Sequence, residues 1–193
     1  CYAKNATIRR IVLTDSSINT TGFAAGSLVG DANSGEIKIA ECYITETVSV
    51  ESTYDAGNDK GAGGIVGYGG AVIAVDTCAF LGTVKAPAYV GTMLGNVWGT
   101  VTVKNSFSLQ PSKFSPKKGL SGSSINNYGT FTDGESGVTV IAAEKMLGAA
   151  AKTNMPLFNW ERAWKTTDRY PVLNVGEYEG VPGQVWGGRL ASG

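Results

Sequence analysis

The chain has 193 residues and a mass of 20.0 kDa, which suits one domain with a sizeable core rather than two ordinary domains. It contains no histidine, which excludes a histidine-based zinc site, a Ser-His-Asp triad and a Cys-His nucleophile pair. Its 16 basic and 16 acidic residues cancel, which argues against binding nucleic acid through a large phosphate footprint. Glycine accounts for 27 residues, about twice its usual share. No apolar run approaches the ~18–20 residues that span a bilayer.

The first residues, Cys1 and Tyr2, resemble the middle of a repeat, and no signal peptide precedes them. We therefore expect the chain to be part of a longer protein, although Cys1 could instead be the lipidated residue of a mature lipoprotein. The three cysteines, Cys1, Cys42 and Cys78, are too few for a disulfide framework and lack the C-x-x-C spacing of metal sites.

A short apolar segment bounded by glycine recurs three times, and an alternating apolar stretch comes after each copy. The glycine-bounded segments are 26–30, 64–67 and 91–95, and the alternating stretches are 37–44, 73–80 and 101–108. The repeat is irregular, since 37 residues separate Val29 from Val66 and 28 separate Val66 from Leu94. Self-similarity of this kind indicates a stacked repeat architecture.

Within each alternating stretch, the positions expected to face inward shift by one residue at a two-residue corner. Ile37 and Ile39 share one phase, whereas Cys42 and Ile44 share the other. Two short strands joined by a corner explain this change, whereas a helix would show a period of 3.6 residues. The corners are expected at Arg9-Arg10, Ala40-Glu41, Asp76-Thr77 and Lys104-Asn105, with a weaker copy at Asn126-Asn127.

These repeats predict an all-β fold, a right-handed parallel β-helix of about five irregular rungs over residues 1–141. We expect about three short strands in each repeat. Glycines fit turns that need positive φ or leave no room for a side chain, as at Ser34-Gly35, Gly69-Gly70 and Gly95-Asn96. Residues 142–193 are expected to form a short, partly helical C-terminal cap of the same domain.

Three small residues occupy equivalent positions directly after the corners: Cys42, Cys78 and Ser106. Stacked strands lie about 4.8 Å apart, so these residues are expected to form an interior ladder. Packing is one interpretation, because free cysteine is often buried. A Cys42–Cys78 disulfide is the alternative that this distance permits.

The repeat resembles the GLUG motif of bacterial surface proteins. The motif takes its name from the pattern G-L-apolar-G, which corresponds here to Gly64-Ile65-Val66-Gly67 followed by Val75-x-x-Cys78-x-Phe80, with further copies at 27–30 and 93–95. The tail, 138–146 and then Phe158-Asn159-Trp160, Trp164 and 170–173, also resembles the segment on the C-terminal side of such repeats.

The resemblance covers roughly residues 3–175; the third copy departs from the pattern at Ser106 and Thr92. Similar repeats occur in adhesin-like proteins and in the N-terminal region of IgA-specific metalloproteases. The resemblance implies an extracellular β-helical module of a bacterial surface protein and carries over no catalytic residues.

The end of a β-helix exposes unpaired backbone that needs cover. Residues 142–152 (AAEKMLGAAAK) favour helix, interrupted by Gly148. We expect the cap residues Phe158, Trp160, Trp164 and Tyr170 to cover the last rung, whereas the N-terminal end has no comparable cap. A carbohydrate-stacking platform is the alternative role for these aromatic residues.

Two loops are longer than a rung requires and are candidate binding segments. The loop 51–60 carries Tyr54, Asp55 and Asp59, and the loop 109–120 carries Lys113, Phe114, Lys117 and Lys118. The acidic loop could bind Ca²⁺ but lacks the D-x-D-x-D-G spacing. The basic loop could meet an acidic glycan or a protein partner, or could simply be solvated.

The sequence therefore predicts a non-catalytic extracellular module with an adhesin-like binding role or a stalk role. Its expected partner is an unidentified glycan or protein on a host or bacterial surface, with no cofactor, nucleic acid or membrane span. One alternative is a polysaccharide lyase or glycoside hydrolase that uses Glu41 and Asp76, which are one position out of register. The other alternative is a purely structural spacer.

Overall fold

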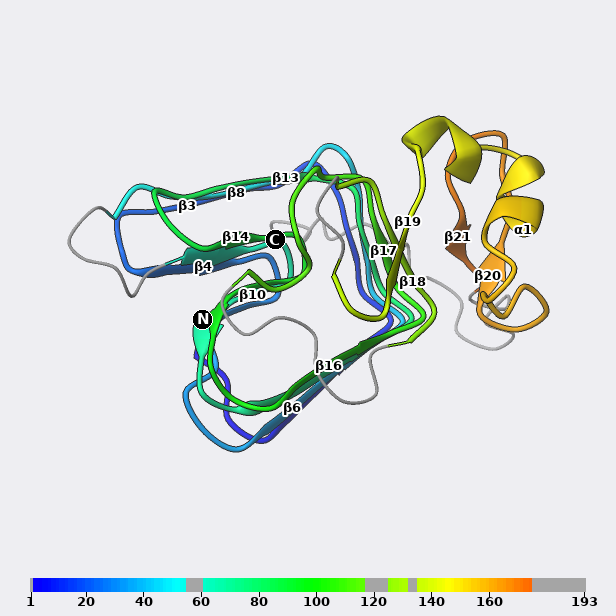
Figure 1. Cartoon of the computed structure of the whole chain (residues 1–193). Coiled ribbons are helices and arrows are strands. Elements are labelled where there is room, and N and C mark those ends of the chain that lie inside the picture. The colour runs from blue at the N-terminus through cyan, green and yellow to red at the C-terminus, as the bar shows by residue number, and fades with distance from the viewer. Residues whose placement is uncertain (1, 55–60, 117–124, 132–134, 175–193) are drawn as a thin grey trace, which may run out of the picture.

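Short parallel strands make up most of the chain. The computed structural model describes residues 2–54, 61–116, 125–131 and 135–174. Within these ranges the strands form five parallel sheets, numbered I to V in the order in which the chain meets them, and one antiparallel pair (Figure 1). The all-β prediction is therefore confirmed at the level of a strand-rich fold with parallel sheets.

Sheets I and II hold the alternating stretches that the sequence identifies. Sheet I contains β1 (Ala6–Arg9), β6 (Glu36–Ala40), β11 (Val72–Asp76) and β16 (Val101–Lys104). Sheet II contains β2 (Val12–Leu13), β7 (Tyr43–Ile44), β12 (Ala79–Phe80), β17 (Phe107–Ser108), β18 (Asn127–Gly129) and β19 (Val138–Val140).

Sheets III to V complete each pass of the chain. Sheet III contains β3 (Ser17–Thr20), β8 (Ser49–Ser52) and β13 (Thr83–Lys85). Sheet IV contains β4 (Ala24–Gly26), β9 (Gly61–Gly63) and β14 (Val90–Gly91). Sheet V contains β5 (Val29–Asp31), β10 (Val66–Gly69) and β15 (Leu94–Val97).

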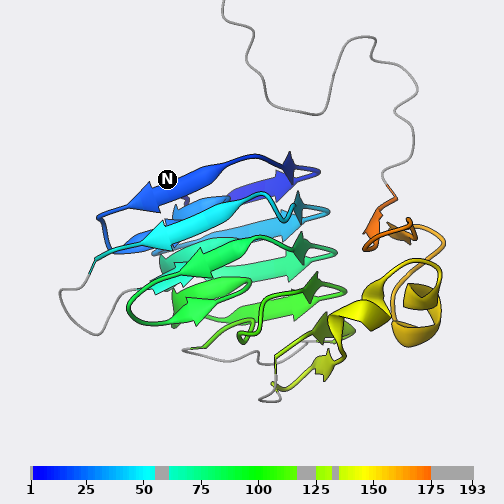
Figure 2. The ribbon, with the colours of Figure 1, turned by 90° about the horizontal axis from the view of Figure 1, so that it is seen from above.

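The chain visits the five sheets in the same order three times and then enters sheets I and II again. Successive passes lie one above another as layers (Figure 2). The pairing brings equivalent residues together: Ile73 pairs with Ile37 on one side and with Val101 on the other. Each complete pass has five strands, so the expectation of about three was wrong, because sheet IV lacks apolar alternation and each strand of sheet III has a single apolar residue, Ile18, Val50 or Val84.

Residues in the left-handed region mark the corner between sheets I and II. Their φ values are 51–58°, at Arg10, Glu41, Thr77, Asn105 and Asn126. In the first four passes this residue is the second of the expected corner pair. In the fifth, Lys104 pairs with Ile125, so the equivalent corner is Ile125-Asn126 and not Asn126-Asn127. Each corner holds one left-handed residue, a conformation that is uncommon outside glycine.

One continuous core fills the space that the five sheets enclose. Columns of apolar side chains run through it from pass to pass, such as Ile39 and Val75, which are each 1% exposed. The first-pass equivalent, Ile8, is only partly buried, because no described strand pairs with β1 on its other side. Burial of these alternating side chains supplies most of the stabilising free energy.

Close backbone contact, rather than positive φ, explains several of the glycines. A Cβ atom added to Gly63 would lie 1.9 Å from the Val66 carbonyl oxygen and 2.5 Å from the Gly95 nitrogen. Gly63 belongs to sheet IV, whereas Val66 and Gly95 belong to sheet V, so the two backbones meet here without room for a side chain. The expected turn at Gly95-Asn96 was wrong, since both residues lie within β15.

Residues 142–174 form a C-terminal unit with two short helices and the antiparallel pair. Its elements are the 3-10 helix η1 (Ala143–Met146), α1 (Ala150–Asn154), β20 (Trp164–Lys165) and β21 (Val172–Leu173). Gly148, with φ +60°, separates the two helices. No helix among the described residues is long and apolar enough to cross a membrane.

The C-terminal unit packs against the outer face of sheet II and does not cover the last strand as expected (Figures 1 and 2). The outward positions of sheet II are apolar, since they carry Tyr43, Ala79, Phe107 and Tyr128. Trp164 packs on this row: its ring lies 5.3 Å from that of Phe107. This row needs cover from water and thereby places the unit at the side of the sheets.

Candidate functional site

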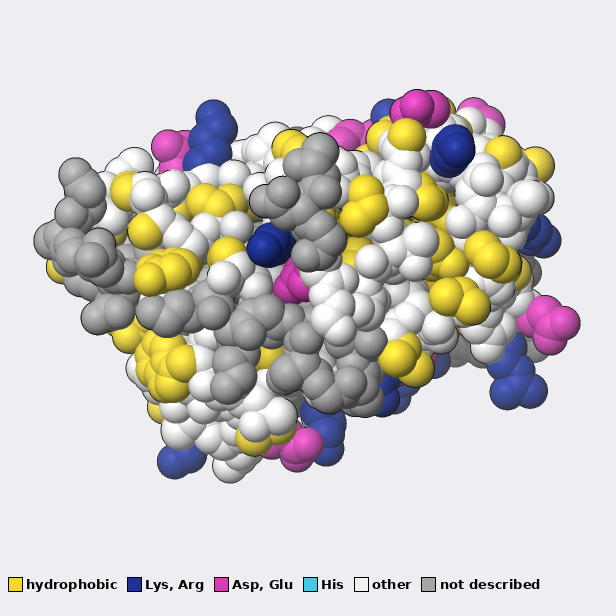
Figure 3. Space-filling view, in the orientation of Figure 1, with side chains coloured by type: hydrophobic (Ala, Val, Ile, Leu, Met, Phe, Trp, Pro, Cys, Tyr) yellow, Lys and Arg dark blue, Asp and Glu magenta, His cyan; other side chains and the backbone are white. Residues whose placement is uncertain are grey.

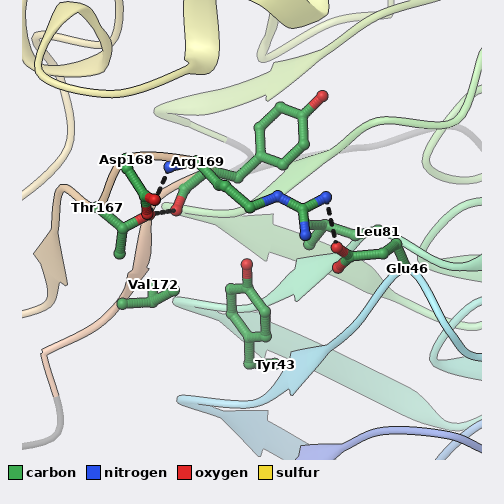
Figure 4. A pocket seen from close by; sticks show the side chains of 8 residues that line it. Tyr43, Glu46, Leu81, Thr167, Asp168, Arg169 and Val172 are labelled. Carbon is green, nitrogen blue, oxygen red and sulfur yellow. Dashed lines mark hydrogen bonds and ion pairs between the residues drawn. The ribbon is translucent and has the colours of Figure 1, made fainter.

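A pocket of about 290 Å³ lies where the C-terminal unit meets sheet II (Figure 4). It is concave and combines apolar walls with a few polar groups, as ligand sites do. Its lining comes from the strand side through Tyr43, Glu46 and Leu81, and from the C-terminal unit through Thr167, Asp168, Arg169, Tyr170 and Val172.

A hydrogen-bonded turn between β20 and β21 holds the polar side of the pocket. The Thr167 hydroxyl donates to the Tyr170 carbonyl over 2.9 Å, and the Arg169 N–H donates to Thr167 Oγ1 over 3.0 Å. The Gly148 N–H donates to the Arg169 carbonyl over 2.7 Å, which anchors the turn to the segment between the two helices. The backbone of this wall is therefore fixed before a ligand arrives.

An ion pair connects the C-terminal unit with the strands across the pocket. A terminal guanidinium nitrogen of Arg169 lies 2.7 Å from Glu46 Oε1. Glu46 belongs to the connection between β7 and β8. Both side chains are well exposed, at 68% and 41%, so the pair contributes at most about 1 kcal/mol to stability. Its main consequence is to fix the guanidinium beside the opening.

The Tyr43 hydroxyl enters the pocket from the strand side, as the Glu46 carboxylate does (Figure 4). Tyr43 is only 8% exposed, and no described residue hydrogen-bonds to its hydroxyl. Burial raises the pKa of the Tyr43 phenol, and the nearby Glu46 carboxylate raises this pKa further. The phenol is therefore neutral at pH 7 and presents one donor and its acceptor lone pairs to the pocket.

No described residue of the two candidate loops lines this pocket. Tyr54 is partly buried after the end of β8, and the acidic loop begins later than expected, because Glu51 belongs to β8. Lys113 is exposed on the surface. Four of the predicted loop residues lie outside the described residues: Asp55, Asp59, Lys117 and Lys118.

The prediction that Phe114 contacts a ligand was wrong, because its side chain is fully buried. The Leu94 N–H donates to the Phe114 carbonyl over 2.8 Å, so this segment lies against β15 in the way that a further strand would. The ring then enters the core, where its centroid lies 6.1 Å from that of Phe131. Backbone pairing outweighs the loop-like composition of the surrounding residues.

Cys42, Cys78 and Ser106 lie in one fully buried row. Both thiols are free, so the structure does not contain the alternative Cys42–Cys78 disulfide. The Cys78 N–H donates to Ser106 Oγ over 3.0 Å, and the Ser106 N–H donates to Asn127 Oδ1 over 3.0 Å. Burial raises the pKa of the Cys78 thiol. The hydrogen bond with Cys78 lowers the pKa of the Cys42 thiol, but the core surrounds the whole row and keeps reagents away from both thiols.

The corner acids already have partners on the scaffold. Glu41 lies 2.7 Å from Arg10 and 3.1 Å from Arg9, and the hydrogen bond from Arg10 lowers the pKa of the Glu41 carboxyl. Asp76 Oδ1 accepts hydrogen bonds from Thr77 Oγ1 over 3.0 Å and from Asn105 Nδ2 over 2.8 Å. Because Asp76 pairs with Ala40, Asp76 and Glu41 are one position out of register.

An exposed aromatic cluster, which the sequence did not reveal, lies outside sheet V. Phe23, Tyr68 and Trp98 meet edge to face, with ring centroids 5.1 Å and 4.7 Å apart. Basic and acidic side chains are interspersed on the face that Figure 3 shows. In the described part of the chain, no three His, Cys, Asp or Glu side chains are grouped to hold a metal ion.

No protein-family model, curated protein or solved structure matches the chain. Sequence reasoning missed six lining residues, namely Tyr43, Glu46, Leu81, Thr167, Asp168 and Arg169, whereas Tyr170 was expected in a cap. Tyr43 could have been noticed because the same outward position carries an apolar residue in the next two passes, Ala79 and Phe107.

Proposed function

We propose that the strands constitute a right-handed parallel β-helix that serves as a non-catalytic binding module of a bacterial surface protein. The parallel registers and the fixed order of sheets I to V support the solenoid. The glycine-bounded repeats and their resemblance to the GLUG motif support an extracellular, adhesin-like setting. The partner is a glycan or protein on a host or bacterial surface.

The Tyr43 hydroxyl carries the proposal of a binding role. The Tyr43 hydroxyl has no hydrogen-bond partner among the described residues and faces the open pocket, so both its donor and its acceptor capacity are available to a ligand there. Tyr43 points this group into the pocket between sheet II and the C-terminal unit, which favours binding over a purely structural spacer. A spacer requires stacked passes but no pocket with an unpaired donor.

The state of the corner acids disfavours the alternative of a polysaccharide-degrading enzyme. A general acid needs a raised pKa, whereas the two arginines beside Glu41 lower the pKa of its carboxyl. Asp76 is engaged by Thr77 and Asn105. Both carboxylates therefore stabilise the corner instead of serving a reaction.

Binding of the full chain to a glycan array and to bacterial and host cell surfaces tests the proposal. Saturable binding supports the module, and its weakening by Tyr43→Phe assigns it to the pocket. Absence of binding to every array glycan and cell type would favour the spacer.

Release of reducing ends from acidic polysaccharides tests the enzyme alternative. Turnover that either Glu41→Gln or Asp76→Asn abolishes would overturn the non-catalytic assignment. The same two variants should bind array glycans like the wild type.

A further inference from the structure

We infer that the pocket between sheet II and the C-terminal unit takes one neutral pyranose ring, such as the terminal sugar of a glycan. This inference rests on the proposed binding function and specifies its ligand. The pocket must match the ligand in size, in the placement of apolar and polar groups, and in charge.

The size of the pocket suits a ligand of one ring. Its volume of about 290 Å³ lies at the lower end of the ~300–1,000 Å³ that ligand sites span. The ion pair between Arg169 and Glu46 crosses the pocket and limits its extension in that direction (Figure 4). A single sugar unit fits such a space, whereas a longer saccharide would continue into solvent.

The walls match the two kinds of surface on a pyranose. A pyranose has faces of C–H groups and a rim of hydroxyls, and aromatic rings attract C–H groups because the ring face is electron-rich. Tyr43, Leu81 and Val172 provide the apolar surface. The Tyr43 hydroxyl and the Asp168 carboxylate provide the polar contacts, and no described residue pairs with either group.

Asp168 favours a ligand with donor hydroxyls. An ionised carboxylate only accepts hydrogen bonds, and its two oxygens can receive two neighbouring hydroxyls of one sugar. Such charge-assisted bonds are roughly twice as strong as neutral ones. The Tyr43 hydroxyl can donate to a ring oxygen or accept from a third hydroxyl.

The charge of the pocket excludes an acidic sugar. Glu46 and Asp168 carry two negative charges against the one positive charge of Arg169, which Glu46 already pairs over 2.7 Å. A sugar carboxylate would therefore meet net repulsion. A neutral hexose has no such penalty, so the pocket discriminates by charge as well as by shape.

The aromatic cluster of Phe23, Tyr68 and Trp98 is the other exposed surface that could contact a sugar. Its rings meet at 73° and 75°, so they present no continuous flat face for a pyranose. Trp98 is 46% exposed and can be truncated without opening the core. Trp98→Ala therefore separates this surface from the pocket.

Titration calorimetry of the full chain with methyl glycosides of glucose, galactose, mannose and N-acetylglucosamine tests the inference, with N-acetylneuraminic acid as the acidic contrast. We expect at least one neutral glycoside to bind with a millimolar Kd. Tyr43→Phe should weaken this binding about 3- to 10-fold, and Asp168→Asn about tenfold. Tyr2→Phe, the same chemical change at a distant exposed site, and Trp98→Ala should leave the Kd unchanged.

Three results would overturn the inference: no neutral glycoside binds at tens of millimolar, N-acetylneuraminic acid binds more tightly, or Tyr43→Phe leaves the Kd unchanged. Thermal unfolding should give equal midpoints for Tyr43→Phe and the wild type, so a lost affinity cannot come from unfolding. If binding to the glycan array is lost in Trp98→Ala but not in Tyr43→Phe, the chain is still a binding module. The pocket is then not its sugar site, and the inference fails while the proposed function stands.

Discussion

Replacing Gly63 with alanine tests the close contact between sheets IV and V. The added Cβ would lie 1.9 Å from the Val66 oxygen, whereas ordinary contact begins at 3.4 Å, so the two backbones must separate by about 1.5 Å. Gly63 pairs with Gly26 on one side and with Gly91 on the other side in the same sheet, so the strand cannot shift alone. Overpacking that side chains can relieve costs about 1–3 kcal/mol, and a clash between backbones should cost at least about 3 kcal/mol.

Thermal and urea unfolding followed by far-UV circular dichroism measures this loss. For a chain of this size, about 3 kcal/mol corresponds to a decrease in Tm of about 6–12 °C. Gly22→Ala is the matched control, because its added Cβ would meet only the Thr20 hydroxyl at 3.1 Å. A loss below about 1 kcal/mol for Gly63→Ala, or an equal loss for Gly22→Ala, would refute the packing argument.

Three further predictions concern the C-terminal unit, the corner and the buried thiols. Trp164→Ala should destabilise the docking of the C-terminal unit by about 3–5 kcal/mol, so limited proteolysis should remove residues 142–174 first; uniform digestion would contradict this. Glu41→Gln should lower the free energy of unfolding at pH 7 by about 0.5–1 kcal/mol, because an exposed ion pair is lost. The folded pKa of Glu41 is below 4.5, so this difference should persist above pH 4.5 and vanish as the pH falls through the folded value; a difference that grows in acid would contradict the ion pair. In a Cys1→Ser background, the thiols of Cys42 and Cys78 should react with a disulfide reagent only after denaturation, and rapid reaction of the folded protein would contradict their burial.

The sequence was sufficient to predict sheets I and II and the corner between them. The phase change between Ile39 and Cys42 is explained by two strands that meet at an angle, and Glu41 has the left-handed backbone of such a bend. Sheets III and IV were not predicted. β3 (SINT) and β4 (AAG) have no apolar alternation, so their strands depend on pairing with β8 and β9 in the next pass.

The pocket was harder to predict than the strands. Apolar alternation identifies inward residues such as Cys42, whereas Tyr43 faces outward and belongs to the row that the C-terminal unit covers. That row of apolar outward residues could have indicated lateral packing. The pairing of Glu46 with Arg169 could not have been found in this way, because it joins exposed residues far apart in the sequence.

The registers also determine where this protein can gain or lose residues. Ala6 pairs with Ile37, 31 residues later, and Val12 with Tyr43 over the same interval, so the corner between sheets I and II has a constant length. The interval is 37 residues where Ala25 pairs with Ala62. The additional six residues therefore enter between sheets II and IV. An insertion at the corner would turn alternate side chains to the wrong face. Insertions between β8 and β9 can instead diversify the surface while the core columns stay in register. The surface loops can therefore evolve independently of the scaffold.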